Sequence, residues 1–286
     1  MNGLIAVTGA TGALGGLVAH RLADLGIQQR LICRRADRAP ALADATVTEA
    51  AYADGGAMKS ALDGAATLFL VSGREAADRL DQHKTAIDAA VRAGVERVVY
   101  TSFFGAASNA TFTLARQHWY TEEHIRASGL RFVFLRDNLY LDVLPYFPGP
   151  DGVIRAPAGH GRFSGVARED IAGVATAVLL DDKHDGKTYR LTGPENLNLD
   201  DVAAILGQAT GRAISYQPET EEEAYTSRAV YNAPAFEVEG WVSSYLAIAA
   251  GEMETVTHDV ESVSGRPPLS LEEFLTAQPD SYQHLI

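Results

Sequence analysis

The chain has little cysteine, little positive charge and no long apolar run. Cys33 is the single cysteine among 286 residues, so a disulfide within the chain is impossible and a reducing compartment, the cytoplasm, is expected. Lys and Arg number 24 against 37 Asp and Glu, a formal net charge of −13. That balance disfavours nonspecific contact with nucleic acid or anionic lipid, because binding phosphates needs a basic surface. No run reaches the roughly 18 apolar residues of a membrane span. The first residues lead directly into a glycine loop, so we expect no signal peptide.

Short apolar runs alternate with segments of helical periodicity through the first half of the chain. The pattern predicts strands at 4–8, 29–33, 67–71, 97–101 and 131–135, and helices at 14–25, 57–62, 78–93 and 113–127. Strict strand–helix alternation is typical of a Rossmann-like α/β fold, a doubly wound parallel sheet with helices on both faces.

The pattern loosens after residue 140. Residues 146–152 (YFPGPDG) predict a loop, and residues 187–192 a strand. Helical segments are predicted at 168–180, at 199–211 behind the N-cap candidate Asn198, and then at 219–223, 233–251 and 270–275. We therefore expect a Rossmann domain over residues 1–140, its sheet completed by segments from 150–195. Residues 141–286 form a smaller α/β region that caps it and holds substrate.

A glycine-rich loop joins the first predicted strand to the first helix. Its residues are Gly9, Ala10, Thr11, Gly12, Ala13, Leu14 and Gly15. Glycines at this spacing allow a pyrophosphate to approach the backbone at a helix N-terminus, so the loop predicts a dinucleotide site. The alternative is a tight β–α turn without a ligand.

Basic residues follow the second predicted strand, where an NAD site usually has Asp or Glu. Arg34, Arg35 and Arg38 lie in one stretch of five residues, although the chain as a whole is acidic. No acid stands between the strand and Asp37. Guanidinium groups bind phosphate oxygens in a bidentate manner. We therefore predict NADP(H), in preference to NAD(H), with Arg34 on the 2′-phosphate and Arg35 or Arg38 assisting. A solvated basic turn is the alternative.

With these motifs in place, the chain resembles the NmrA-like group of atypical short-chain dehydrogenases, and most of all its NADPH-dependent quinone and dye reductases. The resemblance covers nearly the whole chain. The segments that carry it are TGATGALGG (8–16), CRR (33–35), LFLVSG (68–73), GVERVVYTS (94–102), TEEHIRASGLRFVFLRDNLY (121–140), AREDIA (167–172), YRLTGPENLNLDDVA (189–203) and SGRPPLSLEEFL (264–275).

The resemblance implies further site residues. Ser72 and Gly73 pass near the nicotinamide half of the cofactor. Asn138 and Tyr140 border the nicotinamide and the substrate, and Tyr140 is a catalytic candidate. Arg168 closes over cofactor or substrate, unless it only pairs with a nearby acid.

The Tyr-x-x-x-Lys pair of typical short-chain dehydrogenases is absent from the sequence. Glu122 resembles the helix glutamate that normally lies four residues after that lysine. Counting back from it places His118 at the lysine position and Leu114 at the tyrosine position, while Ser102 resembles the partner serine. Ketone reduction creates an alkoxide and demands a positioned acid, whereas a quinone or cationic dye is already a strong electrophile. His118 is our candidate to orient the ribose or donate a proton; a structural histidine is the alternative. The eight histidines show no zinc-like spacing.

Three functions agree with these features of the sequence to different degrees. The leading one is a reductase that transfers hydride from NADPH to a quinone or similar electron-poor aromatic. The second is a non-catalytic NADP(H) sensor that signals to a protein partner. The third, a nucleotide-sugar epimerase, resembles the glycine loop and TGPENL but normally requires the missing pair. Oligomeric state is not indicated.

Overall fold

The predicted alternation of strands and helices is present in the computed structural model, which describes residues 3–286. The strands are β1 (Leu4–Thr8), β2 (Gln29–Cys33), β3 (Ala45–Glu49), β4 (Ala65–Leu70), β5 (Arg97–Phe103), β6 (Arg131–Asp137), β7 (Val153–Ala156), β8 (Thr188–Leu191) and β9 (Ser215–Pro218). The α-helices are α1 (Ala13–Asp24), α2 (Gly55–Leu62), α3 (Arg79–Arg92), α4 (Thr113–Ala127), α5 (Arg168–Leu180), α6 (Leu199–Thr210), α7 (Glu221–Arg228), α8 (Ala235–Ala249), α9 (Asp259–Ser264) and α10 (Leu271–Ala277). The 3-10 segments are η1 (Ala36–Arg38), η2 (Leu141–Tyr146), η3 (Asp182–His184), η4 (Ala229–Tyr231) and η5 (Pro279–Leu285).

The central sheet has seven strands in the order β3-β2-β1-β4-β5-β6-β8. The pairs β1–β2, β2–β3, β1–β4 and β4–β5 are parallel, and the predicted Rossmann-like class is confirmed. The chain winds outward from β1 to β3 and then crosses over to β4, so the strand order reverses between β1 and β4. In open parallel sheets this switch point is where a ligand crevice forms, beyond the carboxyl ends of the strands.

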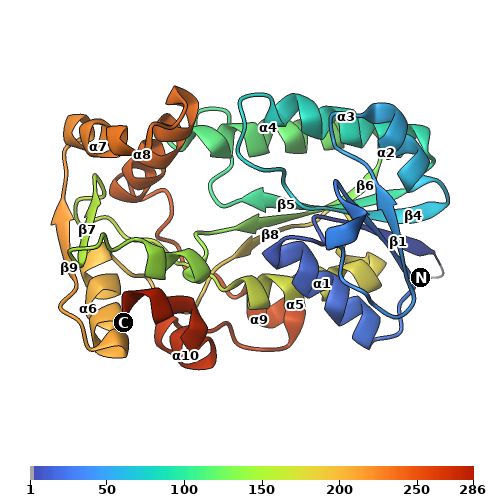
Figure 1. The fold of residues 1–286 in the computed structure, drawn as a ribbon. Helices are drawn as coiled ribbons and strands as arrows, with labels where there is room; N and C mark the ends of the chain where they lie inside the picture. The colour runs from blue at the N-terminus through green and yellow to red at the C-terminus, as the bar shows by residue number, and fades with distance from the viewer. Residues whose placement is uncertain (1–2) are drawn as a thin grey trace. The chain divides into compact units, whose positions relative to one another are not determined.

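The chain divides into two compact units. Unit 1 comprises Met1–Phe103, Gln117–Arg136 and Arg168–Tyr189; unit 2 comprises Phe104–Arg116, Asp137–Ala167 and Arg190–Ile286. Within unit 1, α1 and α5 pack together on one face of the sheet, and α2 and α3 on the other (Figure 1). Unit 2 contains the parallel pair β7–β9 and the helices α6–α10.

Apolar side chains of unit 1 fill the space between the sheet and the helices α2 and α3. Fully buried members of this core include Leu62, Leu68, Ile87, Val98 and Phe134. Burying each such side chain contributes about 1.5–3 kcal/mol, so the sheet is a rigid base for the loops at its carboxyl edge.

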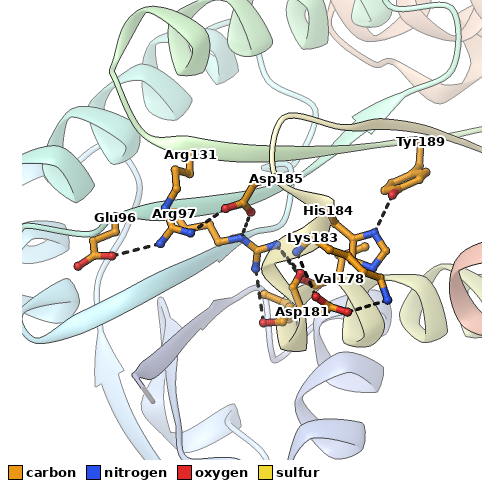
Figure 2. A network of polar contacts seen from close by, with 10 residues as sticks. Glu96, Arg97, Arg131, Val178, Asp181, Lys183, His184, Asp185 and Tyr189 are labelled. Atoms are coloured by element: carbon orange, nitrogen blue, oxygen red, sulfur yellow. Dashed lines mark hydrogen bonds and ion pairs between the residues drawn. The ribbon is translucent and has the colours of Figure 1, made fainter. Parts of the chain in front are cut away.

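A buried arginine ties β5 to the end of α5 within unit 1 (Figure 2). The Arg97 side chain has no exposed surface. Its Nε donates to Asp185 at 2.5 Å, and its Nη2 donates to the carbonyl oxygens of Val178 at 2.7 Å and Asp181 at 3.2 Å. The guanidinium thus satisfies carbonyl groups that a helix leaves free at its C-terminus.

The strands β3, β7 and β9 were not predicted from the sequence. Each has four or five residues, and the side chains of β3 and β9 are mostly half-buried or exposed. Such short edge strands lack the apolar run that marks the buried strands. Among residues 3–286, no helix is long and apolar enough to cross a membrane.

Candidate functional site

A cavity of about 280 Å³ lies in unit 1 at the carboxyl ends of β1, β2 and β4, at the switch point of the sheet. It brings together most of the site residues predicted for this half of the chain: Gly9, Thr11, Gly12, Ala13, Leu14, Gly15, Arg34, Ser72 and Gly73. Ala10 is buried in the same turn but does not line the cavity. Sequence segments more than 60 residues apart therefore meet in one pocket.

The glycine loop turns tightly from β1 into α1. Gly9 has a φ of +67°, and the Gly12 N–H donates to the Gly9 carbonyl at 2.8 Å. A Cβ atom on Gly15 would lie 2.3 Å from that same carbonyl oxygen, so no other residue fits there without moving the backbone. Helix α1 begins with no side-chain cap and no acid in its first turn. Its first N–H groups and the positive end of its dipole are therefore available to an anion.

The two arginines after β2 have different surroundings. Arg34 lines the cavity. Arg35 does not; it forms an ion pair with Asp37, with Nη2 and Oδ2 2.6 Å apart. This contact raises the pKa of Arg35 and lowers the pKa of Asp37. Arg34 is thus the arginine presented to a ligand, and Asp37, the first acid after β2, is already engaged.

The loop after β4 is fixed by three consecutive backbone hydrogen bonds to side chains. The N–H groups of Val71, Ser72 and Gly73 donate to Thr8 Oγ1 at 3.0 Å, Thr101 Oγ1 at 2.7 Å and His83 Nε2 at 2.8 Å, in that order. Tyr52 adds a fourth contact, because its hydroxyl donates to the Val71 carbonyl at 2.7 Å. The amides of Val71, Ser72 and Gly73 are therefore already used, and the backbone of the loop is held in one position.

The protonation state of His83 follows from its partners. The Thr121 hydroxyl donates to the Gln117 carbonyl at 2.8 Å, so it accepts from His83 Nδ1, 3.1 Å away. His83 Nε2 then carries no proton and accepts from Gly73. Burial, and secondly the charge of Arg79, lower the pKa of His83 to about 3. His83 is accordingly neutral when it holds Gly73.

His118 lies behind this loop in the same buried cluster and does not line the cavity. It is 5% exposed, and its Nδ1 is 2.8 Å from the Tyr100 hydroxyl. Burial is the main cause that holds the pKa of His118 well below its ordinary value, followed by the charge of Arg79. Near neutral pH it is an uncharged imidazole, and its predicted catalytic role stays a prediction.

Ser102, the counterpart of the short-chain dehydrogenase serine, is committed to an ion-pair network. Its hydroxyl donates to Glu122 Oε1 at 2.6 Å. The buried Glu122 carboxylate also accepts from Arg136 Nε at 2.8 Å and Nη2 at 2.7 Å, and from Arg126 at 3.1 Å. Because two arginines keep the Glu122 carboxylate charged, the Ser102 hydroxyl proton stays in its hydrogen bond to Glu122.

Two predicted site residues, Asn138 and Tyr140, lie in unit 2. The buried Asn138 amide donates to Ser164 Oγ and to the Met253 carbonyl, both at 3.0 Å. Its Oδ1 accepts from the next backbone N–H. The Tyr140 hydroxyl donates to Asp137 Oδ2 at 3.2 Å. The roles expected of Asn138 and Tyr140 toward a cofactor stay predictions.

Arg168, in unit 1, is the first residue of α5. Its neighbour Glu169 forms an ion pair with Arg21 of α1. The expected role of Arg168, to close over a cofactor or substrate, stays a prediction. Within residues 3–286, no group of three or more His, Cys, Asp or Glu side chains could hold a metal ion.

Several residues that shape the cavity were not among the site residues predicted from the sequence. Tyr52 is the clearest, because it follows β3, a strand that was not predicted. The alternation of residues 45–49 was the available signal: a third parallel strand would have placed Tyr52 at the ligand edge. Thr8, Thr101 and His83 act through the Val71–Gly73 backbone, and no local sequence pattern marks them.

We expect acid to destabilise the fold through His83. In the unfolded chain its pKa is about 6.5, against about 3 in the folded protein. Between these values the unfolded chain binds a proton that the folded chain does not, so the free energy of unfolding falls as the pH is lowered through this range. Urea unfolding at a series of pH values should show a shallower dependence for His83→Gln than for the wild type. His160→Gln, at an exposed histidine, is the control; equal slopes for all three proteins contradict the assignment.

Comparison with known proteins agrees with the fold. The model of the NmrA-like family matches residues 1–260. Quinone oxidoreductase 2 of Escherichia coli is 35% identical, over 77% of this chain and 79% of that protein. The solved structure of the Escherichia coli NADPH-dependent quinone oxidoreductase complexed with NADPH superimposes with a TM-score of 0.87, 30% identity, and coverage of 96% of this chain and 99% of the other. The Citrobacter triphenylmethane reductase complexed with NADP(H) has a TM-score of 0.84, 30% identity and coverage of 96% and 99%.

The sheet order and the cavity define a Rossmann-like α/β protein with a glycine-lined cavity at the switch point. Within that class, the chain belongs to the NmrA-like family. The resemblance inferred from the sequence motifs is thereby confirmed.

Proposed function

We propose that the protein is an NADPH-dependent oxidoreductase that transfers hydride to a quinone or a similarly electron-poor aromatic. The observation that carries the proposal is a glycine-cradled cavity with Arg34 on its wall. The names of the similar proteins, an NADPH-dependent quinone oxidoreductase and a triphenylmethane reductase, agree with it.

The residues of the cavity fit NADPH. The pyrophosphate would lie on the Gly9–Gly15 loop, where the Gly15 position leaves no room for a Cβ and α1 begins without a cap. Arg34 would bind the 2′-phosphate. NADH fits less well, because its ribose diol needs a free acid after β2 and Asp37 is paired with Arg35. Ser72 and Gly73 would lie beside the nicotinamide on their fixed loop. When bound, the cofactor supplies a hydride at the nicotinamide.

The side chains at the positions of the family's catalytic residues favour acceptors that need no strong acid. Leu114 stands at the position of the family's tyrosine, and His118, at the lysine position, is buried and neutral. Ser102 is held by Glu122. An alkoxide formed from a ketone would lack its usual donor here. A quinone or a cationic dye accepts hydride without one, so positioning against the nicotinamide suffices.

Turnover against a panel of acceptors tests the proposal. We expect NADPH oxidation with substituted benzoquinones, naphthoquinones and triphenylmethane dyes, and little with simple ketones. NADPH should be preferred over NADH. If NADPH binds and no acceptor in the panel is reduced, the reductase assignment is wrong.

A non-catalytic NADP(H) sensor is the second candidate, favoured by the same lack of a free acid at Ser102 and His118. Calorimetry with the oxidised and the reduced cofactor separates the two functions. A sensor should discriminate strongly between NADP⁺ and NADPH, or bind a protein partner differently in each state, without turnover. In either function the lone, buried Cys33 fits a reducing compartment, and we place the protein in the cytoplasm.

Replacing His83 should weaken the cofactor pocket without touching the cofactor. His83→Leu removes the acceptor of the half-buried Gly73 N–H. A lost hydrogen bond costs about 0.5–1.5 kcal/mol, so we expect the Kd for NADPH to rise up to about tenfold. In His83→Gln the amide oxygen can still accept from Gly73, and affinity should be largely retained. Fluorescence titration with NADPH measures both. Equal affinities for His83→Leu and the wild type contradict a positioning role for His83.

A further inference from the structure

Unit 2 contains a second cavity, of about 470 Å³, that shares no residue with the dinucleotide pocket. This volume is in the range typical of small-molecule sites. Its walls come from the end of η2 and the loop before β7, from β7 itself, from the end of α7 with η4, and from α8. The lining residues are Tyr146, Phe147, Gly149, Pro150, Asp151, Val153, Arg155, Ser227, Arg228, Tyr231, Trp241 and Tyr245.

Aromatic rings dominate this cavity and stand at steep angles to one another. Tyr231 and Trp241 have ring centroids 5.9 Å apart at 86°, and Phe147 and Tyr245 5.7 Å apart at 66°. Edge-to-face pairs leave part of each ring face uncovered. Tyr231, on η4, is 68% exposed at the rim. A ligand entering the cavity would therefore meet the faces of electron-rich rings, which carry negative charge density.

The charged groups of the cavity compensate one another. The buried Arg228 is paired with the buried Glu219, with Nη1 and Oε2 2.9 Å apart. It also lies 5.4 Å from the centre of the Tyr245 ring. Arg155 is paired with Asp151, with Nη2 and Oδ2 2.8 Å apart. Because both arginines already have a carboxylate partner, the cavity offers no excess positive charge to a phosphate or a carboxylate.

We propose that this cavity, the aromatic pocket of unit 2, binds a flat, uncharged, electron-poor aromatic molecule. The tyrosine and tryptophan faces attract an electron-poor ring, and paired ions add no net charge that would favour an anion. This inference stands on the cavity alone and does not depend on hydride transfer in unit 1.

Tryptophan fluorescence tests the pocket directly, because the chain has two tryptophans and Trp241 lines the cavity whereas Trp119 does not. Trp119→Phe leaves Trp241 as the single tryptophan. Titration with 2,3-dimethyl-1,4-naphthoquinone, without NADPH, should quench its emission saturably. This probe has no free ring position for addition of the Cys33 thiol. Absence of saturable quenching overturns the proposal, and turnover measured separately with NADPH judges the reductase assignment independently.

A pair of tyrosine variants then locates the binding. In the Trp119→Phe background, Tyr231→Ala removes a ring from the wall, and we expect the Kd of the quinone to rise about tenfold, in line with the usual contribution of one stacked aromatic. Tyr225→Ala is the matched control, since Tyr225 is also an exposed tyrosine, on α7, but lies outside the cavity. If the two variants bind equally, the quinone quenches from elsewhere and the pocket is not its site.

Discussion

Arg34→Asp is expected to weaken NADPH binding about a hundredfold and to leave NADH binding within a few fold of the wild type. Arg34 lines the cavity beyond β2, where the 2′-phosphate of NADPH would lie. A charge-assisted contact between guanidinium and phosphate is worth about 1.5–3 kcal/mol, and the new carboxylate adds repulsion. NADH has no 2′-phosphate and loses neither term. Calorimetric titration of both cofactors measures the difference.

The neighbouring arginine supplies the control for this experiment. Arg35 has the same charge and lies one residue along the chain, but it pairs with Asp37 and does not line the cavity. Arg35→Asp should therefore change NADPH affinity far less than Arg34→Asp. An equal loss of NADPH and NADH affinity in Arg34→Asp would show that the phosphate is bound elsewhere.

Arg97→Leu is expected to lower the free energy of unfolding by about 3–5 kcal/mol, the usual cost of removing one partner of a buried ion pair. The substitution leaves Asp185 with one fewer cation and removes the donors to the carbonyl groups at the end of α5 (Figure 2). Helix α5 packs on α1, which follows the glycine loop. Urea unfolding followed by circular dichroism measures the loss.

Arg131 provides the comparison for Arg97. It binds the same carboxylate, Asp185, at 2.7 Å, but its side chain is 46% exposed. Exposed ion pairs contribute about 0–1 kcal/mol, so Arg131→Leu should destabilise the protein only slightly. If Arg97→Leu also costs less than about 1 kcal/mol, burial is not what makes the Arg97 contacts stabilising.

Much of the fold could be predicted from the sequence because local pattern and tertiary environment agree in the core. The strands at 4–8 and 29–33 and the helices at 113–127 and 168–180 have the predicted bounds. Asn198 caps α6 in a capping box, as expected. These elements present apolar residues to a buried face, and that is the signal on which periodicity depends.

Some lining residues of the cavity could be predicted, because the geometry of the backbone dictates the residue type at their positions. The glycines could be identified from their spacing, because a close approach to the Gly9 carbonyl leaves no room for a side chain at position 15. Arg34 could be selected because it directly follows a strand. That Arg35 pairs with Asp37 and does not line the cavity could not be predicted, because this contact depends on the three-dimensional structure.

The contacts around His118 could not be predicted from the sequence. The sequence placed His118 at the family's lysine position but gave no indication of its burial beside Tyr100 and His83. Burial and the charge of Arg79 determine the pKa of His118, and both come from residues distant in the chain.

Transfer of deuterium from NADPH to a dye tests the central claim most directly. The protein is incubated with NADPH deuterated twice at C4 of the nicotinamide and with a triphenylmethane cation, and the reduced dye is analysed by mass spectrometry. The account predicts one deuterium at the central carbon of the reduced dye, with a strong preference for NADPH over NADH. Bound NADPH without any labelled, reduced dye, and without turnover of the quinones in the panel, would contradict it and leave the protein a cofactor-binding sensor.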